Sequence, residues 1–175
     1  MSKFFKIHII NIIFTIILGT ILHFTFGWSN KNLFVGAFSA INESTWEHLK
    51  LLFFPMLITT IFEYLYINKK PQNFLCARTI GILSAILFTT ISFYTYTGIL
   101  GTNYAIINIL IFIISVIFGE YISYKIIISN SFCNNKIAIF TLIILFICFI
   151  FFTYFPPKIG LFKDPISNKY SIFNS

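Results

Sequence analysis

Residues 5–27 read FKIHIINIIFTIILGTILHFTFG. A helix needs about 20 predominantly apolar residues to cross the roughly 30 Å hydrocarbon layer of a bilayer, and this stretch is long enough. Similar apolar stretches follow at about 48–67, 74–97, 104–128 and 136–155. Backbone groups inside a bilayer must be paired within the segment, and none of these stretches alternates polar with apolar residues as a membrane barrel strand does. The sequence therefore predicts an all-α fold: an integral membrane bundle of about five transmembrane helices in a single domain, 1–175.

The composition also indicates a membrane environment. The chain is 58% hydrophobic and only 10% charged, whereas an ordinary soluble domain is about 25% charged. The net charge of +7 comes from lysines that flank the apolar stretches and suit anionic lipid head groups. No basic stripe or RNA-binding motif accompanies them. We expect the lipid bilayer as the main partner, a homo-oligomer or a membrane partner subunit as a further one, and no nucleic acid.

The first stretch is too long for the apolar part of a secretory signal peptide, and no convincing cleavage site follows it directly. We therefore expect it to be retained as a helix. Three cysteines are present, Cys76, Cys133 and Cys148. They show no paired spacing typical of metal ligands, so we expect neither a disulfide nor a redox role.

The distribution of lysine and arginine predicts the orientation in the cell membrane. An N-terminus on the inside places these basic residues on the inner side: Lys3, Lys6, Lys69, Lys70, Arg78, Lys125 and Lys136. It leaves these on the outer side: Lys31, Lys50, Lys158, Lys163 and Lys169. The excess favours a cytoplasmic N-terminus, with a polar tail at 156–175 on the outside.

Three ionisable residues are expected at one depth, toward the inner face. At about 1.5 Å per helical residue, Glu63 lies about 22 Å below His48, and Glu120 lies about 24 Å below the start of its helix. Arg78 falls at nearly the same level from the inner side. Charges in hydrocarbon require partners, so we expect Arg78 to pair with Glu63, Glu120 or both. A structural ion cluster is favoured over a proton or substrate relay.

The segment NESTWEHLK, residues 42–50, has the features of a helix start. Ser44 and Glu47 fit the S/T-x-x-E capping box, and Asn42 is an alternative cap. Trp46 and Lys50 are expected to anchor this end of the helix at the membrane interface.

The same segment supplies candidate metal ligands. His48 lies on the face that leads to Glu63. His23 belongs to a polar stripe of small and polar residues on the first helix, which is expected to face protein and recurs every four residues: Asn11, Thr15, Gly19, His23 and Gly27. These two imidazoles, with Glu43 and Glu47 near them, are a sufficient ligand set for zinc or a similar divalent ion. No H-E-x-x-H pattern supports it, so the sequence favours a hydrogen-bonded structural core over a metal site. A nucleophile pair of Ser44 and His48 is less favoured, because Ser44 already caps the helix.

Residues 42–50, running into Phe53, Phe54 and Pro55, resemble the signature of a family of small, uncharacterised bacterial membrane proteins with several spans. The resemblance extends over most of the chain, including PPKIGLFKDP at 156–165. It implies a polytopic membrane protein, and it supplies no catalytic residue, cofactor or substrate.

Two functions of different classes follow. The first is a non-enzymatic membrane bundle, either permease-like or an accessory subunit. The alternative is a membrane-embedded, metal-dependent hydrolase acting on a lipid or lipid-linked substrate. Clustering of His23, Glu43, Glu47 and His48 would favour the hydrolase, and their separation would favour the bundle.

Overall fold

The computed structural model describes residues 3–129 and 133–170. Within these ranges the chain is helical and has no strand. The long helices are α1 (Lys3–Trp28), α3 (Thr45–Tyr66), α4 (Phe74–Leu100), α5 (Ala105–Ser129) and α6 (Asn135–Tyr154). All five are long and apolar enough to cross a membrane. The predicted fold class is confirmed.

The helix boundaries follow local capping. α3 begins at Thr45 with Ser44 as its cap, as predicted: Ser44 is extended and its hydroxyl accepts the N–H of Glu47. α4 continues to Leu100 and ends at Gly101, whose φ of 68° is in the left-handed region that glycine adopts without strain. Two short elements that the sequence analysis did not predict are the helix α2 (Leu33–Gly36) and the 3-10 turn η1 (Gly160–Phe162). Residues 171–175 of the predicted tail lie outside the described residues.

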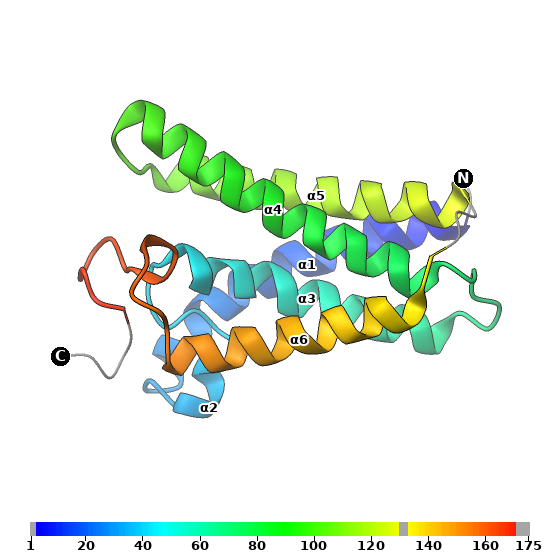
Figure 1. Cartoon of the computed structure of the whole chain (residues 1–175), viewed down its shortest axis with the longest axis horizontal. Coiled ribbons are helices and arrows are strands. Elements are labelled where there is room, and N and C mark those ends of the chain that lie inside the picture. The colour runs from blue at the N-terminus through cyan, green and yellow to red at the C-terminus, as the bar shows by residue number, and fades with distance from the viewer. Residues whose placement is uncertain (1–2, 130–132, 171–175) are drawn as a thin grey trace.

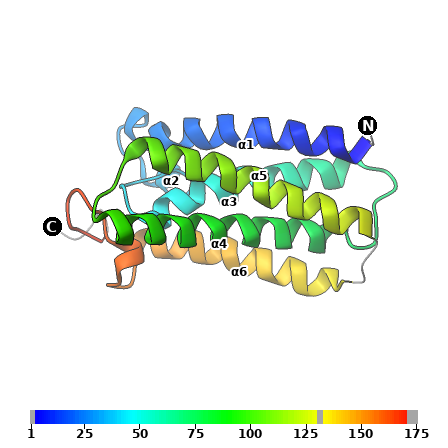
Figure 2. The ribbon, with the colours of Figure 1, turned by 90° about the horizontal axis from the view of Figure 1, so that it is seen from above.

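The long helices run side by side along one direction (Figures 1 and 2). α3 is the central helix, since 61% of its apolar window is buried, compared with 22% for α1, α5 and α6. α4 and α5 form a hairpin that packs on the others. α1, α4 and α6 begin at one end of the bundle, which we call the N-terminal end. α3 and α5 begin at the opposite end, which we call the C-terminal end.

α4 and α5 cross at two glycines. A Cβ atom added to Gly119 would lie 2.6 Å from the carbonyl oxygen of Gly81, and one added to Gly81 would lie 2.7 Å from that of Gly119. Small residues allow helix backbones in membranes to approach this closely. This crossing determines the position of α5 beside α4. It therefore also determines where the side chains of α5 lie within the bundle.

A disulfide joins Cys76, near the start of α4, to Cys133, just before α6, with a Cα–Cα distance of 6.0 Å. The expectation of no disulfide was wrong. The two cysteines are 57 residues apart in sequence, and only the packing of α6 beside α4 brings them together. Cys148 is a free cysteine.

Candidate functional site

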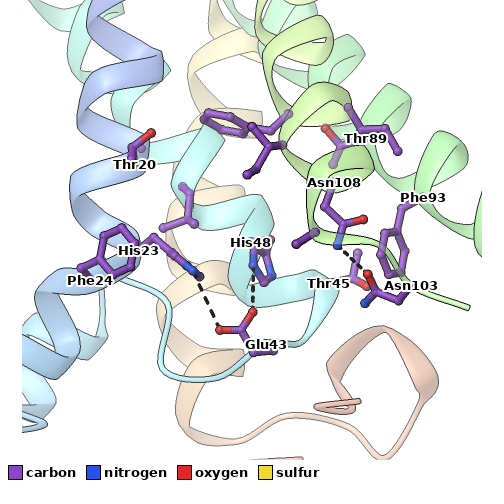
Figure 3. A pocket seen from close by; sticks show the side chains of 16 residues that line it. Thr20, His23, Phe24, Glu43, Thr45, His48, Thr89, Phe93, Asn103 and Asn108 are labelled. Carbon is purple, nitrogen blue, oxygen red and sulfur yellow. Dashed lines mark hydrogen bonds and ion pairs between the residues drawn. The ribbon is translucent and has the colours of Figure 1, made fainter. Parts of the chain in front are cut away.

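Two histidines and a glutamate meet at the C-terminal end of the bundle (Figure 3). His23 comes from α1, His48 from the first turn of α3, and Glu43 from the segment just before α3. The Glu43 carboxylate lies between the imidazoles: Oε1 is 3.9 Å from His23 Nε2, and Oε2 is 3.4 Å from His48 Nε2. We call these three residues the His–Glu–His site.

The backbone ahead of α3 orients His48. Its Nδ1 lies 3.0 Å from the carbonyl oxygen of Ser44. A carbonyl only accepts hydrogen bonds, so Nδ1 carries a proton, and Nε2 is the ring nitrogen that faces the Glu43 carboxylate. Histidines that bind metals are commonly held in this way. The hydroxyl of Ser44 is buried in its capping role and does not contact the imidazole, so Ser44 and His48 do not form a nucleophile pair.

The distances suit a divalent ion after a small closure. One ligand atom from each of the three residues lies within 4.8 Å of the others, whereas tetrahedral zinc with bonds of about 2.1 Å holds its ligand atoms about 3.4 Å apart. All three side chains are partly exposed, at 30% for His23, 43% for Glu43 and 36% for His48. Three protein ligands would leave a coordination position for water or a substrate.

The site opens into a cavity of about 330 Å³ between α1, α3, α4 and α5. Its walls are mainly apolar and include Leu51, Phe93 and Phe112. Across the cavity from the histidines, the amide of Asn108 donates to the side-chain oxygen of Asn103 at 2.7 Å (Figure 3).

Two apolar lining residues, Phe24 and Ile109, are 49% and 59% exposed. The cavity is therefore accessible from outside the bundle.

Glu47, the fourth predicted ligand, points away from the site. Its carboxylate lies 2.6 Å from the Lys50 ammonium and accepts hydrogen bonds from the N–H of Ile41 and the hydroxyl of Thr153. Lys50 also donates to the carbonyl of Gly36 and has no exposed surface. The prediction of Glu47 as a metal ligand and of Lys50 as an interface anchor was wrong, because α6 and the segment containing α2 cover this face of α3.

Trp46 is likewise covered. Its ring packs against Phe149, Phe152 and Phe162, with centroid distances of 4.5, 5.7 and 4.7 Å. Phe162 belongs to η1, which folds back over the start of α3. Trp46 is therefore half-buried and packs against these rings, and its role as an interface anchor stays a prediction. The Asn42 side chain accepts the N–H of Ser44, which Glu47 would accept in a complete capping box.

The family described as "Family of unknown function (DUF6512)" matches residues 1–172, nearly the whole chain. The chain belongs to DUF6512. No curated protein and no solved structure matches it.

The DUF6512 chain also contains a buried charged cluster, in the half of the bundle near its N-terminal end. Arg78 of α4 is fully buried, 2.6 Å from the Glu120 carboxylate of α5 and 3.2 Å from the Glu63 carboxylate of α3. The structure thus brings the three predicted residues together. Asn11 of α1 donates to Glu63 at 2.9 Å.

His8 is the member of this cluster that the sequence analysis missed. Its Nδ1 lies 2.5 Å from Glu120 Oε2. It stands three residues before Asn11, at helical spacing, so it extends the polar stripe of α1 by one turn. Following that stripe toward the N-terminus would have identified it.

Proposed function

We propose that this DUF6512 protein binds a divalent ion, such as zinc, at His23, Glu43 and His48 and hydrolyses a lipid or lipid-linked substrate there. The convergence of these three side chains at an accessible, mainly apolar cavity is the observation that supports the proposal. A set of two histidines and one carboxylate with an open position is typical of catalytic zinc.

The residues around the cavity suit the two parts of such a substrate. Leu51, Phe93 and Phe112 would contact an acyl or isoprenoid chain, while the amides of Asn103 and Asn108 would hydrogen-bond a polar group opposite the histidines. His23 is five residues from the end of α1 at Trp28, about 8 Å along the helix axis. The scissile bond would therefore lie close to the level of the lipid head groups.

The chemistry assigned to a bound ion is to make a water molecule nucleophilic near neutral pH and to polarise the bond that it attacks. The protein residues hold that arrangement in place. Ser44 orients the imidazole of His48 through its carbonyl, and Glu43, located outside the helix, can move toward both imidazoles.

Localisation in the cell membrane with a cytoplasmic N-terminus is part of the proposal. It follows from the lysine and arginine distribution and places the His–Glu–His site near the outer leaflet.

A non-enzymatic, permease-like or accessory bundle is the second candidate function. The observation that favours it is the polar stripe on α1, which connects the buried cluster to the cavity through Thr15. The Thr15 hydroxyl is fully buried and has no hydrogen-bond partner among the described residues. Such a bundle would act as a homo-oligomer or with a partner subunit.

Metal content and hydrolysis by the detergent-purified protein distinguish the two candidates. We expect about one divalent ion per chain in the native protein, and its loss together with activity in His23→Ala, His48→Ala and Glu43→Gln. Activity would be measured on vesicles containing fluorogenic ester and phosphodiester lipids. Ser44→Ala is the matched control, since its hydroxyl does not face the site. Unchanged metal content in His48→Ala, with the variant still folded, would refute the hydrolase.

A further inference from the structure

The cavity beside the His–Glu–His site is polar at one end and apolar at the other. At the C-terminal end of the bundle, Asn103 lies in the loop before α5, and its side-chain oxygen accepts from the amide of Asn108 at 2.7 Å (Figure 3). The Tyr96 hydroxyl donates to Asn108. Deeper in the bundle the walls include Leu51 and Phe112. A membrane lipid has the same order of parts, a polar head group followed by an apolar chain.

The threonines in the deep part of the cavity add little polarity to it. The Thr20 hydroxyl donates to the carbonyl of Ile16 at 2.8 Å, and the Thr89 hydroxyl donates to the carbonyl of Ala85 at 2.9 Å. Each hydroxyl thus bonds within its own helix, and neither has a proton left to donate to a ligand. These contacts favour a hydrocarbon chain as the occupant of the deep part.

Phe112 of α5 closes the deep end of the cavity against α1. A Cβ atom added to Gly19 would lie 2.7 Å from Phe112 Cζ and 2.5 Å from the carbonyl oxygen of Leu51. The phenyl ring therefore lies directly on the backbone of α1, in a notch that a side chain at position 19 would fill. Gly19 is nine residues before the end of α1 at Trp28, about 14 Å along the helix. A chain that enters the cavity cannot pass beyond this contact while the ring stays in the notch.

Beside this floor the cavity opens sideways, between α1 and α5. The lining residues Thr20 and Phe24 of α1 and Ile109 of α5 are exposed. On α3 and α4, by contrast, the lining residue Leu51 is buried and Phe93 is half-buried. The exposed edge of the cavity is therefore formed by α1 and α5.

The depth of this opening indicates what lies outside it. α1 has 26 residues and is about 39 Å long, whereas the hydrocarbon layer is about 30 Å thick. Thr20 is eight residues before the end of α1 at Trp28, about 12 Å along the helix. It therefore lies within the hydrocarbon layer, and the side opening faces lipid chains rather than water.

We propose that a bilayer lipid enters the cavity through this side opening, with one acyl chain between α1 and α5 and its head group at Asn103 and Asn108. The chain contacts Leu51 and Phe112 inside the cavity and continues into the bilayer. This route deepens the proposed function, which requires a lipid at the site, yet it needs neither a metal nor hydrolysis. A non-enzymatic bundle would hold such a lipid in the same way.

Photocrosslinking of the full chain in phosphatidylcholine vesicles tests this route, with adducts located by peptide mass spectrometry. One preparation contains a lipid with a diazirine near the end of an acyl chain, and the other a lipid with a diazirine on its head group. Leu51 is the diagnostic residue, because it lines the cavity but is only 5% exposed. We expect the chain probe to label Leu51 and the head-group probe to spare it. Ile82 is fully buried and does not line the cavity, so neither probe should label it.

A variant at the opening tests the point of entry. Thr20→Trp places a large ring at the side opening, so labelling of Leu51 by the chain probe should be lost. Ile21→Trp is the matched control, because Ile21 is the next residue of α1 and is also exposed but does not line the cavity. It should keep the labelling of Leu51. An unlabelled Ile82 shows that each variant remains folded.

An unlabelled Leu51 in the native protein, with adducts only at outward-facing residues such as Ile10, would overturn the proposal. Labelling of Leu51 by the head-group probe alone would do the same, because the cavity would then hold a polar group. Equal labelling of Leu51 in folded Thr20→Trp and in the native protein would place the entry elsewhere and refute the side opening. If Thr20→Trp unfolds, the two probes on the native protein still decide. A labelled Leu51 in a protein without hydrolysis would refute the hydrolase and retain the lipid route.

Discussion

Lys50 and Arg78 are fully buried cations, and each contacts a carboxylate on a neighbouring turn or helix. Such pairs add little net stability when intact, because desolvation opposes their attraction. Removing one partner is different, since it leaves a buried charge without compensation. This asymmetry makes Lys50 a sensitive position even though it lies outside the His–Glu–His site.

We expect Lys50→Met to lower the free energy of unfolding by roughly 3–5 kcal/mol, because Glu47 would remain buried without its cation. The double variant Glu47→Gln, Lys50→Met should recover much of this loss. Unfolding in mixed micelles measures both, with Lys158→Met as the control at an exposed lysine. If Lys50→Met and Lys158→Met unfold with equal free energies, Lys50 reaches water or the head groups.

Ser44→Ala should lower the free energy of unfolding by about 1 kcal/mol, because the N–H of Glu47 loses the hydroxyl that caps α3. The carbonyl that orients His48 is retained, so the metal content should not change. Unfolding curves and metal analysis of the same preparation test both statements. Loss of metal would show that the hydroxyl contributes to the site.

At the scale of single elements, the contact between α4 and α5 depends on Gly81 and Gly119. We expect Gly119→Ala to lower the free energy of unfolding by roughly 1–3 kcal/mol, because its Cβ would meet the Gly81 carbonyl and the two backbones would have to separate. Gly98→Ala is the matched control on α4, where an added Cβ has no atom within 4 Å. It should be neutral or slightly stabilising, because alanine favours the helix. Thermal unfolding in micelles compares the two variants.

The helices themselves could be predicted from the sequence, because the length of an apolar stretch is set by the bilayer and is independent of neighbouring helices. The direction in which each side chain faces could not be predicted as well. It depends on short elements that have no long apolar stretch. Lys50 was expected at the interface, yet it is fully buried and donates to the carbonyl of Gly36 in α2, and η1 packs on the neighbouring Trp46. These short, irregular segments gave no periodic pattern from which their position could be inferred.

The prediction of Glu47 as a ligand beside His48 could have been rejected from the sequence. Glu47 and His48 are consecutive in a helix and therefore point about 100° apart, so they could not both face His23. Glu43 precedes the helix and is free of that constraint. The convergence of His23 and His48, by contrast, followed from the polar face of each helix, and their ring centroids lie 5.3 Å apart.

At the scale of the whole molecule, an odd number of spans places the two termini on opposite sides of the membrane. We expect an impermeant maleimide added to intact cells to label Ser175→Cys and to spare Ser2→Cys, with the native cysteines replaced in both variants. Labelling after permeabilisation is the control for reactivity. Labelling of both positions in intact cells would contradict five crossings, and labelling of Ser2→Cys alone would reverse the orientation.

The Cys76–Cys133 disulfide at the N-terminal end links insertion direction to redox state. Such bonds persist in oxidising compartments and are rare in the cytosol. The cytoplasmic N-terminus proposed above would expose the pair to a reducing compartment, so that orientation and the disulfide of the structure oppose each other. With the reverse insertion the pair faces an oxidising compartment and forms the disulfide. A cross-link between two residues 57 positions apart would raise the free energy of unfolding by about 4 kcal/mol in the chain-entropy model. Thermal inactivation of native membranes with and without a reductant therefore reports which way the chain was inserted.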